Sequence, residues 1–225
     1  MYVPQQFALS DQDRIVDLIE RFDFALMITA LDGRPTAVHL PFLYDPSRGE
    51  KGTLLAHMAK ANPQWQDFEA MAAAGGEALV IFQGPHAYIS PSDYRSDKPN
   101  VPTWNYLAVH AYGCPRVISE PGAVRDLLSR LSEKQEAGRS QPWRFESLPE
   151  KFSAAMMGGI VAFEIPVSRL EAKAKLNQNK PPKQMAAAAA ALAAADDPLA
   201  RSLAEEMKRV LQEESRLAGE AAKES

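Results

Sequence analysis

The chain has 225 residues, a formal net charge of −4 and 46% hydrophobic residues, which is typical of a globular protein. The acidic balance argues against non-specific nucleic-acid binding through one large positive surface, although a local basic segment stays open. The single cysteine, Cys114, excludes an internal disulfide and indicates a reducing compartment. We find no signal-peptide pattern, and the longest apolar run, FALMITAL, is too short to cross a bilayer, so we expect a cytoplasmic protein without a membrane partner.

The first half of the chain predicts helices and strands in close succession. Ser10 and the apolar spacing after it predict a helix over residues 11–22. FALMITAL predicts a buried strand, and the Asp-Gly turn in LDGRP predicts that PTAVHLPFLY pairs back on it as a hairpin. GTLLAHM and EALVIFQ predict two further strands. Between them, Asn62 and Pro63 are typical of the start of a helix over NPQWQDFEAMAAA.

The second half begins with a polar segment, residues 92–102, which predicts a long loop of the kind that often carries function. A strand over about 103–112, an amphipathic helix over PGAVRDLLSRLSEKQEA, an irregular or short helical segment over 138–158 and a long strand over GGIVAFEIPVSRLEAKAKL follow. About six strands, short connections and few parallel crossovers predict an α+β, mainly β fold: an antiparallel barrel with peripheral helices.

The C-terminal segment differs in composition from the rest. QNKPPKQ ends the strand pattern, and the alanine-rich run after it has strong helix propensity. A final helix carries an apolar stripe made of Leu199, Leu203, Met207, Val210, Leu211 and Leu217. Packing of this helix on its own domain and packing on a second subunit are both open. We therefore divide the chain into a domain of residues 1–180 and a helical extension of residues 181–225.

Familiar catalytic and metal-binding motifs are missing from the sequence. There is no HExxH pattern, nucleophile elbow, Walker loop or GxGxxG after a strand, so the catalytic residues stay unknown. The four histidines, His39, His57, His86 and His110, lack the spacing of a zinc site, and we predict no metal.

Four segments mix aromatic side chains with amide, hydroxyl or cationic ones: HMAKANPQW, FQGPHAYISP, VPTWNYLAVHAYG and AKLNQNK. This mixture suits a flat anionic ligand, because aromatic faces stack on a ring and basic groups hold a phosphate. On the strand over 103–112, Trp104, Tyr106 and His110 share one face and Asn105 lies on the other. Which of the two faces meets a ligand is open.

These segments, with the N-terminal MYVPQQF, resemble the PaiB-type FMN-binding negative transcriptional regulators over roughly residues 1–180. The resemblance implies a split β-barrel, a homodimer and FMN at the subunit interface. The residues that we assign to the cofactor on this basis are His57, Lys60, Asn62, His86, Ser90, Tyr94, Thr103, Trp104, Asn105, Tyr106, His110, Lys175, Gln178, Asn179 and Lys180. Lys173 is a further candidate partner of the phosphate. The sequence departs from the family at Asn177, where serine is usual, and at Asp93, where an aromatic is usual.

The resemblance favours a PaiB-like negative transcriptional regulator. DNA as a direct partner has little support from the sequence, because the helices over 11–22 and 120–137 carry few basic residues and several acids. Regulation through a protein partner is the other route. An FMN-dependent oxidoreductase acting on a small molecule is the alternative function, with Tyr94 and Arg95 of the long loop as candidate contacts. A haem-binding split barrel with a histidine axial ligand is the third.

Overall fold

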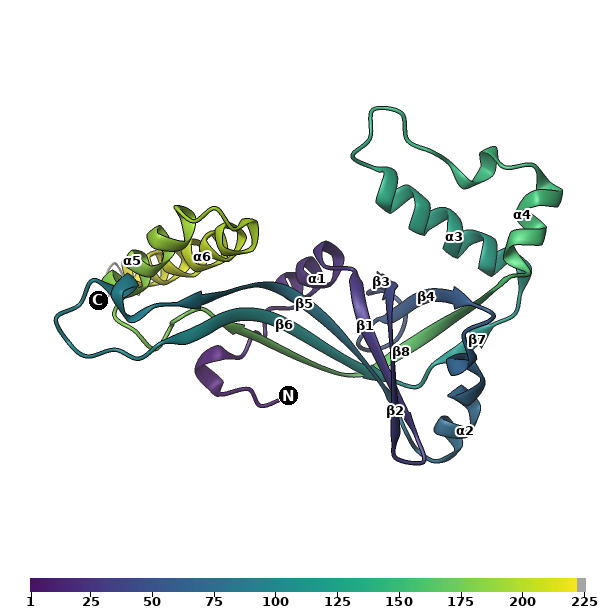
Figure 1. Ribbon diagram of the computed structural model, residues 1–225, viewed down its shortest axis with the longest axis horizontal. Coiled ribbons are helices and arrows are strands. Elements are labelled where there is room, and N and C mark those ends of the chain that lie inside the picture. The colour runs from purple at the N-terminus through teal and green to yellow at the C-terminus, as the bar shows by residue number, and fades with distance from the viewer. Residues whose placement is uncertain (222–225) are drawn as a thin grey trace. The chain divides into compact units, whose positions relative to one another are not determined.

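The computed structural model describes residues 1–221, apart from the side chains of Glu214, Leu217, Ala218 and Ala221 (Figure 1). Leu217 of the predicted stripe and residues 222–225 of the predicted extension lie outside the described residues. The chain divides into two compact units. Unit 1 contains residues 1–11, 83–108 and 172–225, and unit 2 contains residues 12–82 and 109–171. The boundaries fall within three strands: β5 (Ala78–Ile89), β6 (Thr103–Gly113) and β8 (Ile160–Lys175).

The sheet within the described residues has eight strands, two more than the sequence predicted. Its order is β2-β1-β5-β6-β8-β4-β3, and β7 pairs with β8. The pairs β1–β2, β1–β5, β3–β4, β4–β8 and β7–β8 are antiparallel. The five shorter strands are β1 (Phe24–Leu31), β2 (Arg34–Pro41), β3 (Leu43–Asp45), β4 (Thr53–Ala59) and β7 (Arg116–Ile118).

The predicted hairpin over FALMITAL and its partner is confirmed. Leu31 pairs with Arg34, so Asp32 and Gly33 form a two-residue turn, with φ angles of 49° and 75°. Both angles lie in the left-handed region that such hairpin turns require, which an Asp-Gly pair adopts readily. The single strand predicted for PTAVHLPFLY is wrong, because it is interrupted at Phe42. The N–H of Phe42 donates to the carbonyl of Asp23 at 2.9 Å, and its side chain is fully buried.

Four α-helices belong to the described part of unit 2: α1 (Gln12–Arg21), α2 (Phe68–Ala73), α3 (Pro121–Glu136) and α4 (Glu150–Met157). A 3₁₀ turn over Pro63–Asp67 precedes α2, so the helix predicted from Asn62 begins with a tighter turn. Leu127 and Leu131 of α3 pack on Leu43, Leu55 and Ala162, which covers one face of β3, β4 and β8. No helix within residues 1–221 is long and apolar enough to cross a membrane.

The C-terminal helices α5 (Pro182–Ala193) and α6 (Pro198–Ala221) are part of unit 1, where they lie side by side (Figure 1). Leu203 and Met207 of the predicted stripe are fully buried. The side-chain amide of Asn105 on β6 donates to Met207 Sδ at 3.7 Å, so α6 packs on this strand. The alanine-rich face of α5 lets the two helices approach closely, because alanine side chains occupy little space.

Four phenylalanines form the aromatic core of unit 2. Phe163 on β8 lies edge to face with Phe42, at 6.3 Å between ring centroids, and with Phe68, at 5.3 Å. Phe82 on β5 makes the same kind of contact with Phe42 at 6.0 Å. All four rings are almost completely shielded from solvent. Aromatic pairs in this geometry add stability beyond the burial of their area.

Phe163→Ala should therefore destabilise the protein strongly. Removing a buried phenylalanine leaves a cavity and costs about 3–5 kcal/mol of unfolding free energy. Urea denaturation followed by circular dichroism measures the loss. Phe152→Ala on α4 is the matched control, since Phe152 is 52% exposed, and it should change stability by no more than about 0.5 kcal/mol. Equal losses in the two variants would contradict the role given to the aromatic core.

Candidate functional site

The aromatic run on β6 has one buried face and one solvent-facing side. Asn105, Leu107 and Val109 are fully buried, whereas Trp104 is 55% exposed and Tyr106 is half-buried. His110 and Tyr112 continue the face of Trp104. The face left open by the sequence is thereby settled for the fold: the Asn105 face supplies core, and the Trp104 face is free to meet a ligand or a partner.

Two lysines on β8 lie on the same face of the strand in unit 1. Lys173 is nearly buried, and its amino group donates to the carbonyl of Tyr2 at 3.2 Å. The same amino group lies 5.2 Å from the centre of the Tyr106 ring, within the range of a cation–π contact. A positive charge is thus held inside unit 1 by a carbonyl and an aromatic face.

Lys175 stands two residues further along the same strand. Its amino group donates to Thr103 Oγ1 at 2.5 Å and to the carbonyl of Trp104 at 2.8 Å. Burial lowers the pKa of Lys175, and the neighbouring charge of Lys173 lowers this pKa further. Within the described residues neither lysine forms an ion pair with a carboxylate. An anion placed here would relieve the repulsion between the two ammonium groups.

The turn after β8 is tied to the loop after β5. Tyr94 is buried, and its hydroxyl donates to Asn177 Oδ1 at 3.5 Å. Lys180 donates to Asn100 Oδ1 at 2.7 Å and lies 5.0 Å from the centre of the Tyr94 ring. Asn177 has a φ of 69°, a left-handed conformation that asparagine tolerates better than most residues. This conformation gives a physical reason for an asparagine where serine is usual.

Several other predicted cofactor residues support the backbone of unit 1. Gln178 accepts from the Leu176 N–H and donates to the carbonyl of Ala174, whereas Asn179 is exposed. Ser90 caps the 3₁₀ turn Pro91–Tyr94 inside the predicted long loop, and Asp93 accepts from the Ser90 N–H at 2.8 Å. Asp93, which departs from the family pattern, thus closes a capping box.

An aromatic patch on unit 1, made of His86, Tyr88 and Trp104, carries two large exposed rings. Trp104 lies 6.0 Å from Tyr88 and 6.3 Å from His86, measured between ring centroids. Tyr88 is 49% exposed. Exposed apolar side chains that gather in this way commonly mark ligand or protein contacts.

The remaining predicted cofactor residues lie in unit 2. His57 on β4 is half-buried, and its Nδ1 atom has no hydrogen-bond partner among the described residues. Asn62 accepts from the Gln64 N–H at 3.0 Å and so caps the turn that follows β4. His110 is half-buried on β6. Lys60, between His57 and Asn62, is exposed.

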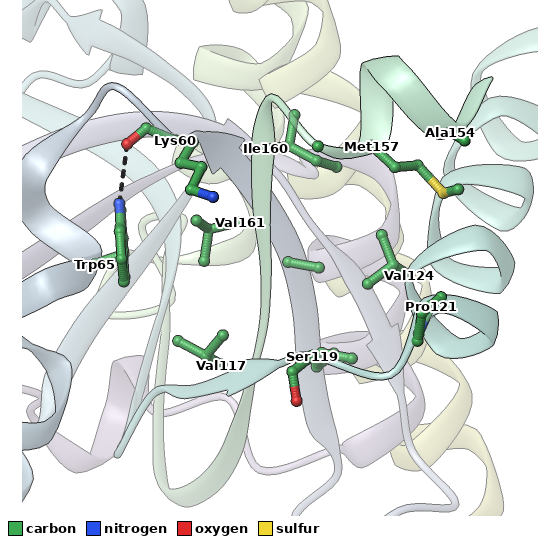
Figure 2. Close-up of a pocket in the computed structure, with 13 residues that line it drawn as sticks. Lys60, Trp65, Val117, Ser119, Pro121, Val124, Ala154, Met157, Ile160 and Val161 are labelled. Atoms are coloured by element: carbon green, nitrogen blue, oxygen red, sulfur yellow. Dashed lines mark hydrogen bonds between the residues drawn. The ribbon is translucent and has the colours of Figure 1, made fainter. Parts of the chain in front are cut away.

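Lys60 lines a pocket of about 530 Å³ in unit 2 (Figure 2). Trp65 stands beside Lys60, and its indole N–H donates to the Lys60 carbonyl at 3.1 Å. Aliphatic side chains from β7, α3, α4 and β8 complete most of the wall, among them Val117, Val124 and Val161. The pocket is therefore apolar apart from a cation at its edge and the hydroxyl group of Ser119.

Sequence reasoning did not assign a role to Trp65, Ser119 or Val117. Trp65 lies inside the quoted segment HMAKANPQW, so its aromatic ring beside a lysine was the available signal. Ser119 and Val117 gave no signal, because β7 is three residues long and was not predicted. No group of three or more histidine, cysteine or acidic side chains within the described residues is arranged to hold a metal ion.

The sequence as a whole matches a known family. Residues 1–169 match the model of the family described as "Putative FMN-binding domain". The protease synthase and sporulation protein PAI 2 of Bacillus subtilis (strain 168) is 35% identical over 207 residues, which cover 92% of this chain and 96% of that protein. An uncharacterized protein of Emericella nidulans is 33% identical over 62% of this chain and 68% of its own length. The chain belongs to the PaiB-type FMN-binding domain family, as its motifs predicted.

Solved structures share the fold at low sequence identity. The FAD and heme binding protein from Mycobacterium smegmatis has a TM-score of 0.56 and 19% identity, with 80% of this chain and 78% of that chain covered. A conserved hypothetical protein from Mycobacterium tuberculosis has a TM-score of 0.54 and 13% identity, with coverage of 80% and 94%. The predicted class, an α+β and mainly β split barrel with peripheral helices, is confirmed.

His57 should make the stability of the protein depend on pH. Burial lowers the pKa of its imidazole, so folding favours the neutral ring. This contribution is fully present above the unfolded-state pKa of about 6.5, and it is lost as the pH falls through the lower folded-state pKa. His57→Gln should therefore reduce the loss of unfolding free energy between about pH 8 and pH 5, as measured by urea denaturation. His39→Gln, on an exposed side chain, is the matched control; an H57Q variant as acid-sensitive as the wild type would contradict this assignment.

Proposed function

We propose that this protein binds FMN and acts as a PaiB-like negative transcriptional regulator. The observation that carries the cofactor assignment is the lysine pair on β8. Lys173 and Lys175 bring two positive charges to one face of the strand, held by neutral oxygens and an aromatic ring. A phosphate dianion fits this donor set, because it accepts several charge-assisted hydrogen bonds and offsets both charges.

The neighbouring groups suit the other end of the same ligand. Trp104 is exposed and its carbonyl accepts from Lys175, so a large aromatic surface stands next to the cationic group. Thr103 offers a hydroxyl beside it, already in contact with the lysine. In this assignment Lys175 and Thr103 hold the phosphate, and Trp104 and Tyr106 offer faces for the flavin ring. Bound FMN would supply hydride and electron transfer, and these residues would bind and orient it.

The family supports the identity of the ligand and the regulatory role. Its model description refers to FMN, and the Bacillus subtilis relative, which spans nearly the full length of this chain, is named for protease synthesis and sporulation. A homodimer with FMN at the subunit interface belongs to the same proposal, since the aromatic patch exposes Tyr88 and Trp104. Sedimentation velocity tests this part, and a monomer at tens of micromolar would contradict it.

Lys175→Ala should weaken FMN binding roughly 10-fold to 100-fold, because a hydrogen bond to a charged group is worth about 1.5–3 kcal/mol. The visible absorption spectrum of the purified protein, release of flavin by heat and titration with added FMN measure this effect. Lys183→Ala on α5 is the matched control, since Lys183 is an exposed lysine in the same unit. Wild-type affinity in K175A would place the phosphate elsewhere, with Lys60 as the next candidate.

The regulatory role has a separate readout in cells. Deleting the gene should raise a defined set of transcripts, and restoring the wild-type gene should lower them again. Restoring the K175A gene should repress less if FMN is needed for repression. A DNA fragment from a responding promoter tests direct binding, since a specific complex survives raised salt whereas a non-specific one dissociates. An unchanged transcript profile in the deletion strain would overturn the regulatory role and leave the flavin assignment in place.

A further inference from the structure

The pocket beside Lys60 has the size and the lining of a small-molecule site. Its volume of about 530 Å³ lies within the range of about 300–1,000 Å³ that is typical of ligand pockets. All residues that line it belong to unit 2, and most of their side chains are aliphatic. The cofactor assignment above uses none of them. An apolar ligand would gain free energy by covering this surface.

Lys60 is positioned by its backbone, and its amino group is left available. The Lys60 N–H donates to the carbonyl of Gly159 at 2.9 Å, and the Lys60 carbonyl accepts from Trp65. Its amino group has no hydrogen bond or ion pair among the described residues. Figure 2 shows the Lys60 side chain directed over Val161, on the same side of the pocket as Trp65. One unneutralised cation therefore stands at the edge of an otherwise apolar space.

Trp65 restricts the shape of the ligand that the pocket can accept. Its hydrogen bond to Lys60 fixes the indole, whose flat face lies across the pocket from the helices α3 and α4 (Figure 2). A flat ring packs on an indole face over a larger area than a branched chain does. Val117 and Val161 offer aliphatic contacts near this face.

We propose that this pocket binds an aromatic carboxylate, with its ring beside Trp65 and its carboxylate on the Lys60 amino group. A single cation matches the single charge of a carboxylate, whereas a phosphate dianion in apolar surroundings would need more donors than Lys60 and Ser119 provide. The site is independent of the lysine pair on β8, so the protein would carry a flavin and a second small molecule at separate places.

The test uses 2-naphthoate and the neutral 2-naphthamide as probes of the full chain, with binding followed by isothermal titration calorimetry. Wild-type protein should bind 2-naphthoate more tightly than 2-naphthamide. Lys60→Met keeps the apolar stem and removes the charge, so it should weaken 2-naphthoate about tenfold and leave 2-naphthamide almost unchanged. Ala154→Phe on α4 should weaken both probes by filling the pocket, as Ala154 lines it from an exposed helix position.

Lys151→Met on the same helix is the matched control and should bind both probes like the wild type, because Lys151 is exposed and does not line the pocket. Circular dichroism of each variant checks that the fold is intact. FMN retention separates this proposal from the previous one: K60M should keep FMN, and K175A should keep 2-naphthoate. Absence of 2-naphthoate binding, or equal affinity of K60M and the wild type, would overturn the proposal. Competition between FMN and 2-naphthoate would overturn it as well, because the pocket would then belong to the flavin.

Discussion

The alternation of side chains along β6 is the constraint on which the candidate flavin site depends. Asn105, Leu107 and Val109 fill the core, so the residues between them must face the other way. A shift of one residue in the pairing of this strand would bury Trp104 and expose Leu107. The free energy gained by burying aliphatic side chains on one face thus determines where the aromatic side chains of the other face appear.

The lysines on β8 obey the same alternation, and their surroundings explain why they suit an anion. Lys175 has lost part of its hydration, and the carbonyl and hydroxyl oxygens that it contacts replace only some of it. Lys173 is more deeply buried and relies on one carbonyl and the Tyr106 ring. Two such charges on one face repel each other in an environment that screens them poorly. A bound anion is the simplest group that removes this cost, whereas a structural role alone would be served by one lysine.

The parts of the fold that depend on local sequence were predictable. Asp32 and Gly33 define their turn because few other pairs tolerate two left-handed conformations, and Asn62 marks its capped turn through its own side chain. The break at Phe42 was not predictable, because it depends on a tertiary contact with Asp23 and on burial of the ring in the aromatic core. The short strand β7 carries too few residues to show a period, so the wall that it gives to the pocket was invisible in the sequence.

The candidate site shows the same division between local and tertiary information. The motifs predicted which residue types gather, but not which of them serve the backbone: Gln178, Ser90 and Asn62 have hydrogen-bonding groups committed to turns. Lysine contexts differ as well. Lys175 is held by two oxygens and beside a second charge, which favours a doubly charged ligand, while Lys60 is solvated and alone at the edge of apolar walls. Desolvation strengthens the attraction for a phosphate at the first lysine, and the apolar surface beside the second supplies most of the affinity for a singly charged ring. The two lysines therefore favour different ligands through different terms of the binding free energy, although both belong to segments that the sequence marked for one cofactor.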